Sequence, residues 1–159
     1  TLYMRIKAIL NMKKGTSVIV LSIIGAVILI STGGGLKIAN AVDYTQTGAL
    51  VGYGGQIFGL IDVTTDGHKT QMNVATDFIP PSGKTYEVWL VDGNYAASGY
   101  PLSMGQIDSS GNLKFNENMV NAFTYTDVVV TIEPIDDKDP KPAWSNSVAA
   151  YWLAPPFGQ

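Results

Sequence analysis

The chain has 159 residues and no cysteine, so neither a disulfide nor a thiolate metal site contributes to its stability. Residues 1–41 hold five basic residues and no acidic one, whereas residues 42–159 hold all 13 acidic residues and five lysines. This second part has a net charge of −8 (5 − 13). It argues against nucleic acid as a partner, because nucleic-acid binding needs Lys and Arg to neutralise phosphates.

The N-terminal 41 residues have the layout of an export signal. A basic start at residues 12–14 precedes an apolar run at 18–30, and Ala39-Asn40-Ala41 is a small-x-small cleavage signature. The run is shorter than the roughly 20 residues of a transmembrane helix. We therefore expect a cleaved signal peptide and a mature protein that starts near Val42.

Two alternatives for this segment stay open. The hydrophobic helix remains as an uncleaved membrane anchor if residues 33–36 extend it, because membrane helices tolerate glycine. A prepilin-type signal is the other, since Lys13-Lys14-Gly15 precedes the apolar stretch. The membrane is then a partner only through residues 1–41, and only if they are retained.

Short β-forming segments separated by turn residues follow the leader. The pairs Gly54-Gly55 and Asp66-Gly67 predict tight turns. The polar stretch 108–112 predicts a turn from which residues 113–115 pair back on residues 102–107. A short helix or 3₁₀ turn is expected within residues 116–126. The expected strands are 48–53, 56–63, 70–78, 85–92, 102–107, 113–115, 127–133 and 147–153.

Residues 85–92 are the expected central strand. Tyr86, Val88 and Leu90 alternate with Glu87, Trp89 and Val91, so both faces of this strand are predicted to be covered. Phe78 and Trp152 are also expected to point into the core. Seven or eight short strands at intervals of roughly 8–12 residues predict an all-β fold, an antiparallel β-sandwich over residues 42–159 that follows an N-terminal signal or anchor helix.

No catalytic constellation is evident. His68 is the only histidine and lies in a predicted turn, so we expect it at the surface. A serine hydrolase of the Gly-x-Ser-x-Gly type is not indicated, because that motif does not occur. We expect a protein that is not an enzyme and has no cofactor.

Asp136, Asp137 and Asp139 are the one candidate metal site, since calcium prefers several oxygen ligands. Lys138 lies among them and no EF-hand spacing is present, which favours a solvated acidic turn. For partner binding the candidates are Tyr95, Tyr100 and Trp144, because aromatic residues in loops are often used in recognition.

Several pieces of the C-terminal half occur in a characteristic order. They are Gly83-Lys84-Thr85-Tyr86-Glu87-Val88-Trp89-Leu90-Val91-Asp92, then Leu102-Ser103-Met104-Gly105-Gln106-Ile107, and then Val130-Thr131-Ile132-Glu133-Pro134 before a polar loop. Over residues 80–153 the chain resembles the extracytoplasmic domain of the anti-sigma-K factor (RskA-like) family. The resemblance implies a β-sandwich outside the membrane, with a sensory or partner-facing role. We expect no zinc-containing cytoplasmic anti-sigma module here, because residues 1–17 contain neither Cys nor His.

Three functions follow as hypotheses. The first is a secreted or cell-surface domain, not an enzyme, that binds a protein or supports structure at the cell envelope. The second is a subunit of an extracellular filament that self-associates by strand addition, with residues 42–50 as donor and a first strand missing from its own fold. The third is a membrane-anchored signalling protein of the anti-sigma type.

Overall fold

The computed structural model describes residues 42–93, 100–119 and 121–159. The predicted signal or anchor helix in residues 1–41 and the candidate Tyr95 lie outside the described residues. No helix within the described ranges is long and apolar enough to cross a membrane.

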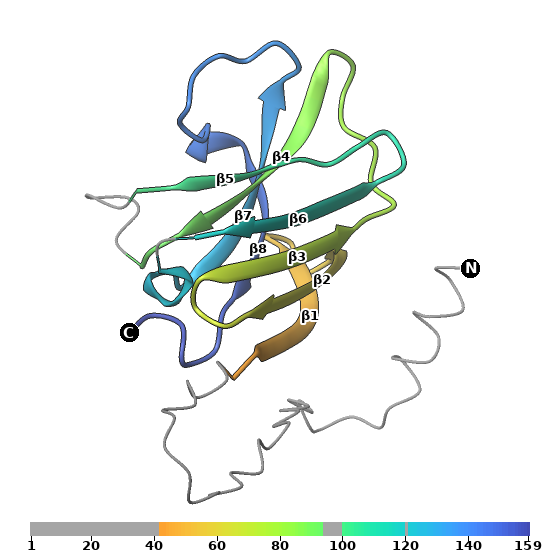
Figure 1. Ribbon diagram of the computed structural model, residues 1–159. Helices are drawn as coiled ribbons and strands as arrows, with labels where there is room; N and C mark the ends of the chain where they lie inside the picture. Colours follow the sequence, from red (N-terminus) through yellow and green to blue (C-terminus); the bar gives the residue numbers. More distant parts are fainter. Residues whose placement is uncertain (1–41, 94–99, 120) are drawn as a thin grey trace, which may run out of the picture.

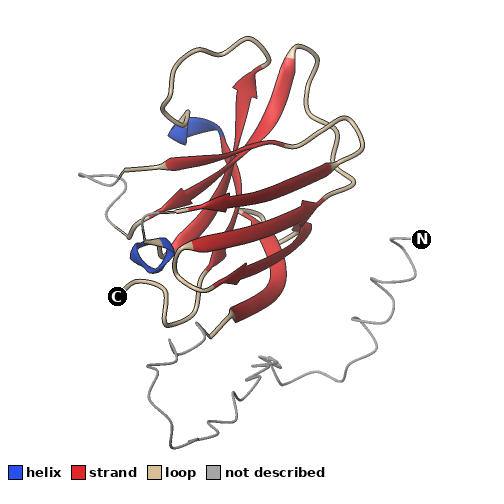
Figure 2. Ribbon diagram, in the orientation of Figure 1, coloured by secondary structure: helices blue, strands red, loops and turns tan. Residues whose placement is uncertain are grey.

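The described chain is built from β-strands, as the alternating sequence predicts (Figures 1 and 2). The only helical elements among the described residues are two single 3₁₀ turns, of which η1 (Ala122–Thr124) falls inside the stretch where one was expected. The other is η2 (Trp144–Asn146). The strands are β1 (Tyr44–Gly52), β2 (Ile57–Thr65), β3 (Lys69–Ala75), β4 (Lys84–Val91), β5 (Leu102–Gln106), β6 (Asn112–Asn118), β7 (Asp127–Pro134) and β8 (Ser147–Trp152).

All eight strands join in one antiparallel sheet, in the order β5-β4-β7-β8-β1-β2-β3-β6. The all-β antiparallel prediction is confirmed, but the two separate sheets of a sandwich are not found. The strands β5-β4-β7-β8 and the strands β1-β2-β3-β6 form one sheet because β1 pairs with β8. This pairing runs through Val51 and Gly52, after a bulge between Leu50 and Val51. The sheet curls until its edge strands β5 and β6 lie on the same side of the molecule (Figure 1).

The central strand is covered on both faces, as predicted. Tyr86, Val88 and Leu90 point into the main core inside the curled sheet. Trp89 and Val91 belong to a second, smaller cluster on the outside, where Val129 and the half-buried Trp144 pack against them. Covering by a loop on the outside therefore explains why β4 carries an almost continuous apolar run.

The two glycine-marked turns join paired strands. β1 pairs with β2 across the Gly54-Gly55 turn, and β2 pairs with β3 across Asp66-Gly67. The Asp66 carboxylate accepts the backbone N–H groups of Lys69 at 2.7 Å and His68 at 2.8 Å. These two bonds lower the pKa of Asp66. Both turn predictions are confirmed.

The turn predicted at residues 108–112 forms, and the Asp108 N–H donates to the Asn112 carbonyl across it at 2.8 Å. The strand pairing predicted across this turn is wrong. β5 pairs with β4 and β6 pairs with β3, and no ladder joins β5 to β6 in the part of the chain that the structure describes. The two arms of the turn are held by different strands. The N–H of Ile107 donates to the carbonyl of Tyr86 at 2.9 Å, and the carbonyl of Gly111 accepts the N–H of Thr76 at 2.8 Å.

Two core assignments are also wrong. Strand β3 ends at Ala75, and Phe78 lies 45% exposed beyond it, stacked on Phe58. The chain leaves the strand there because the Thr76 side chain bonds both the Phe58 carbonyl and the Phe78 N–H. Trp152 is 63% exposed because its neighbours Tyr151 and Leu153 take the inward positions of β8 and its end.

Candidate functional site

A cleft of about 500 Å³ opens where the two edge strands diverge. At the turn end β5 and β6 are close, since a Cβ placed on Gly105 would lie 3.3 Å from Leu113 Cδ1. At the other end Leu102 and Ser103 line one side of the cleft, and Glu117 and Asn118 line the other. The space is therefore a wedge bounded by two strands that do not pair with each other.

The wall of the cleft is largely apolar. Leu102 from β5 and Phe115 from β6 face it, together with Met119, which is 8% exposed, and the half-buried Tyr125. Leu102 itself is 36% exposed. Such a surface favours an apolar side chain of a partner, because burying it removes apolar area from water.

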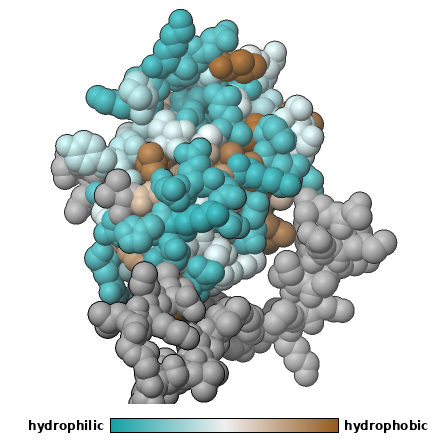
Figure 3. Space-filling view, viewed as in Figure 1, coloured by the Kyte–Doolittle hydropathy of each residue, from teal (hydrophilic) through white to brown (hydrophobic). Residues whose placement is uncertain are grey.

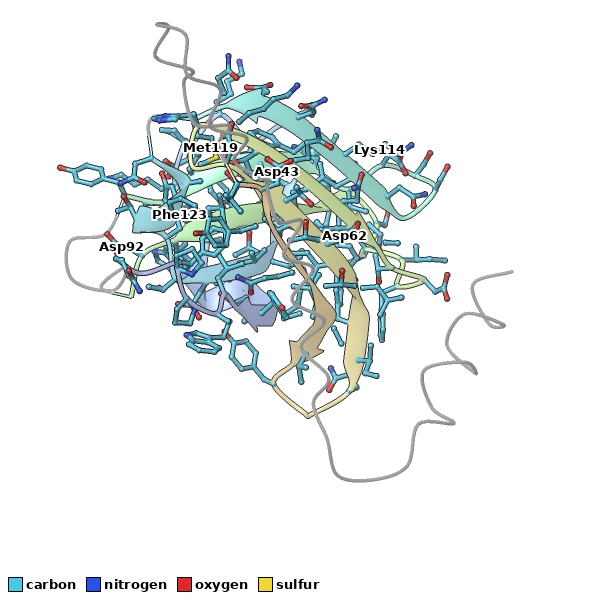
Figure 4. The ribbon with its side chains drawn as sticks, turned by 60° about the horizontal axis from the view of Figure 1, so that its bottom comes forward. Asp43, Asp62, Asp92, Lys114, Met119 and Phe123 are labelled. Atoms are coloured by element: carbon cyan, nitrogen blue, oxygen red, sulfur yellow. The ribbon has the colours of Figure 1, made fainter. Side chains whose placement is uncertain are left out.

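The charged side chains among the described residues that line the cleft are acidic. Asp92, which follows β4, and Glu117 of β6 line the cleft, and none of the described lining residues is basic. Burial, and after it the negative charge of Asp92, raise the pKa of the Tyr125 phenol. Figure 4 shows Asp92, Met119 and Phe123 toward one end of the molecule and Lys114 away from them.

Of the three predicted partner-binding aromatics, the structure places one in this cleft. Tyr100 lies just before β5, lines the cleft and is 85% exposed. Trp144 does not line it; this side chain covers Trp89, Val91 and Val129 on the outer face of the sheet. Tyr95 lies outside the described residues. Trp144 thus has a packing role in the fold.

The loop that carries Trp144 is tied to the sheet by a buried polar chain. The indole N–H of Trp89 donates to Thr131 Oγ1 at 2.9 Å, and the Thr131 hydroxyl donates to Glu133 Oε1 at 2.6 Å. The same carboxylate oxygen accepts the backbone N–H of Ala143 at 2.8 Å. Glu133 is only 1% exposed, so this chain anchors the loop over the outer cluster.

The candidate calcium ligands do not come together as a built site. Asp136, Asp137 and Asp139 are exposed in the loop after β7. The carboxylates of Asp137 and Asp139 accept the N–H groups of Asp139 and Lys141, at 2.8 and 3.1 Å, as in ordinary polar turns. No group of three His, Asp or Glu side chains with metal-binding geometry occurs among the described residues. A calcium site there stays a prediction without structural support.

His68 lies exposed in the β2–β3 turn, as expected. The sequence reading missed Leu102, Phe115, Met119 and Tyr125 as possible contact residues. Their apolar character resembles that of core residues, so only the separation of β5 from β6 distinguishes them. The face in Figure 3 is largely hydrophilic, with hydrophobic surface in small separate patches.

Comparison with known proteins gives one family match. The model of a family described as anti-sigma-K factor RskA, C-terminal, matches residues 20–147. No curated protein and no solved structure matches the chain. The family match covers most of the chain and includes all the strands through β7, which confirms the resemblance noted in residues 80–153. The chain therefore belongs to the RskA C-terminal family and is a domain related to anti-sigma factors.

Proposed function

We propose that this chain is an extracytoplasmic binding domain of an anti-sigma-K-type protein, without enzymatic activity, and that it engages a protein partner at the cleft between β5 and β6. The observation that carries the proposal is the cleft itself, which combines an apolar wall with two unpaired strand edges in a family related to anti-sigma factors. Proteins of that kind act through protein partners.

Exposed aromatic and apolar residues support this choice of surface. Interface centres are enriched in aromatic residues and depleted in charged residues, while the rim stays polar. Tyr100 and Phe115 are the aromatic residues of this surface, and Leu102 adds an apolar one. Glu117 contributes to the polar rim. The net charge of −8 on residues 42–159 favours a partner with a basic surface.

The location can be tested with single cysteines, because the natural sequence contains none. Lys138→Cys places a thiol in the exposed loop after β7. We expect a membrane-impermeant maleimide to label this variant on intact cells that express the full chain. Labelling only after lysis would contradict an extracytoplasmic location. The unmodified chain, without a thiol, is the control.

Binding at the cleft can be tested by photo-crosslinking in the same cells. A benzophenone amino acid at Tyr100 is expected to give a discrete adduct of higher mass. The matched control is the same substitution at Tyr53, which is 77% exposed in the β1–β2 turn. No adduct from position 100, or the same adduct from both positions, would contradict a binding site at the cleft.

A filament formed by strand addition would use a different part of the chain from the one expected. Residues 44–52 fill a position inside their own sheet as β1, between β8 and β2, which differs from the missing first strand that the hypothesis requires. Strand addition is instead supported at β5 and β6.

Anchored signalling is supported by the family match, which extends to residue 20. The variant Ser17→Cys tests anchored signalling with the same maleimide. For an anchor we expect the native protein to retain residues 1–41, and the maleimide to label Cys at position 17 only after lysis.

A further inference from the structure

The free edges of the sheet define what kind of ligand the cleft can take. β5 has β4 as its only strand neighbour and β6 has β3, so one side of each strand has no ladder in the described part of the chain. The backbone N–H and C=O groups on such sides can pair with an added strand. Here the two free sides flank a single gap.

The gap is wide at one end only. Gly105 and Leu113 nearly touch beside the turn, whereas the cleft of about 500 Å³ separates Leu102 and Ser103 from Glu117 and Asn118. Adjacent strands lie about 4.8 Å apart, so a strand placed between two others needs about twice that spacing. An extended segment would enter from the open end, beside Tyr100, because the near contact of Gly105 with Leu113 closes the other end.

The side chains around the gap select the segment. A strand presents alternate residues to opposite faces. Residues facing inward would meet Leu102, Phe115 and Met119, which requires apolar side chains. At the open end the exposed carboxylate of Glu117 favours a basic residue of the partner.

We propose that the partner inserts one extended segment between β5 and β6, with alternating apolar side chains inward and a basic residue at the open end. This inference rests on the proposed function, because it names the ligand class of the same cleft. The added strand would pair with the free sides of β5 and β6 at the open end of the wedge and close the sheet there. Main-chain bonds would provide affinity, and the alternate side chains would provide specificity.

The test uses a defined probe. A labelled peptide, acetyl-Lys-Val-Thr-Val-Thr-Val-Lys-amide, is titrated into the full chain in a mild detergent, and binding is followed by fluorescence anisotropy and by hydrogen exchange. We expect slower amide exchange in both β5 and β6. A peptide with N-methyl groups at alternate residues should lose this protection, because it cannot form the ladder. A peptide with Glu in place of Lys should bind more weakly.

A matched pair of charge reversals tests the acidic rim. Glu117→Lys is expected to weaken binding of the basic peptide about tenfold, which corresponds to about 1.4 kcal/mol. Asp77→Lys changes the net charge equally but lies near the β5–β6 turn and does not line the cleft. It should leave the affinity nearly unchanged, because exposed charges beyond about 10 Å are screened at 0.1 M salt.

The outcomes separate this inference from the proposed function. Protection of only one edge, protection that survives N-methylation, or equal effects of the two reversals would overturn strand insertion. Absent protection with an adduct still formed at Tyr100 would overturn strand insertion and leave the cleft as a binding site. Protection that grows with protein concentration without peptide would assign the gap to a second copy of this chain, and would also overturn the inference.

Discussion

Thr131 Oγ1 donates a 2.6 Å hydrogen bond to Glu133 Oε1, and both side chains are buried on the outer face of β7. Residues two apart on a strand share a face, which is what allows this contact. The pair links the Trp89 side chain of β4 to the backbone of Ala143 in the loop after β7. The pair therefore fixes the loop that covers the outer cluster.

Thr131→Val tests this connection. The change keeps the shape of the side chain but leaves the Trp89 indole N–H without its acceptor, and a buried unpaired donor costs about 1–3 kcal/mol. We expect the free energy of unfolding to fall by about 2 kcal/mol, measured by urea unfolding with tryptophan fluorescence. Thr47→Val, at an exposed position of β1, is the control and should stay within about 0.5 kcal/mol.

The pH dependence of stability reports on Glu87. Burial is the main cause that raises the pKa of this carboxyl group, the Ser103 hydroxyl partly opposes it, and the charges of Glu133 and Asp137 add to it. A carboxyl with a raised pKa binds more protons in the folded state, so its contribution is fully present below the unfolded pKa and is lost as pH rises through the folded pKa. Glu87→Gln should therefore flatten the loss of stability above about pH 4.5. An unchanged pH profile would contradict this role.

Gly111→Ala tests the backbone contact between the β5–β6 turn and Thr76, where the Thr76 N–H donates to the Gly111 carbonyl. Gly111 has φ +77°, and an added Cβ would overlap the backbone carbonyl of Thr76. We expect the free energy of unfolding, measured by urea unfolding, to fall by about 3 kcal/mol or more, because both the clash and the left-handed backbone oppose the change. Gly83→Ala is the matched control: its φ is +73° but the space around it is open, so only about 1–2 kcal/mol should be lost.

The two tryptophans at opposite degrees of burial give a direct comparison. Trp89 is 2% exposed, and Trp89→Ala should cost about 3–5 kcal/mol through the cavity it leaves. Trp152 is 63% exposed, so Trp152→Ser should change the free energy of unfolding by less than about 0.5 kcal/mol. A large loss for Trp152→Ser would show that another surface of the protein covers this side chain.

Local sequence patterns were sufficient for the strands because alternation along a strand is a local property. Residues 85–92 and 127–133 were predicted close to the observed β4 and β7. The two glycine-marked turns formed as expected, since Gly54-Gly55 and Asp66-Gly67 set their own turn geometry. Trp152 was misplaced because an aromatic residue at the end of a strand can face either side.

The candidate site was predicted only in part. Tyr100 was selected because it is an aromatic residue in a loop, and it lines the cleft. The same argument selected Trp144, which packs on Trp89 instead. Nothing in the sequence of residues 102–118 signalled that the two arms of their turn would bond to Tyr86 and Thr76, which belong to other parts of the sheet.

The sequence by itself determined the strands, two tight turns, the acidic character of residues 42–159 and the family, because each depends on residues close together in the chain or on their order. Only the tertiary structure decided which strands pair, and with that the single curled sheet and the cleft between β5 and β6. Strand pairing depends on backbone bonds between distant residues and on the burial of a shared core. Those contacts exist only once the whole sheet has folded.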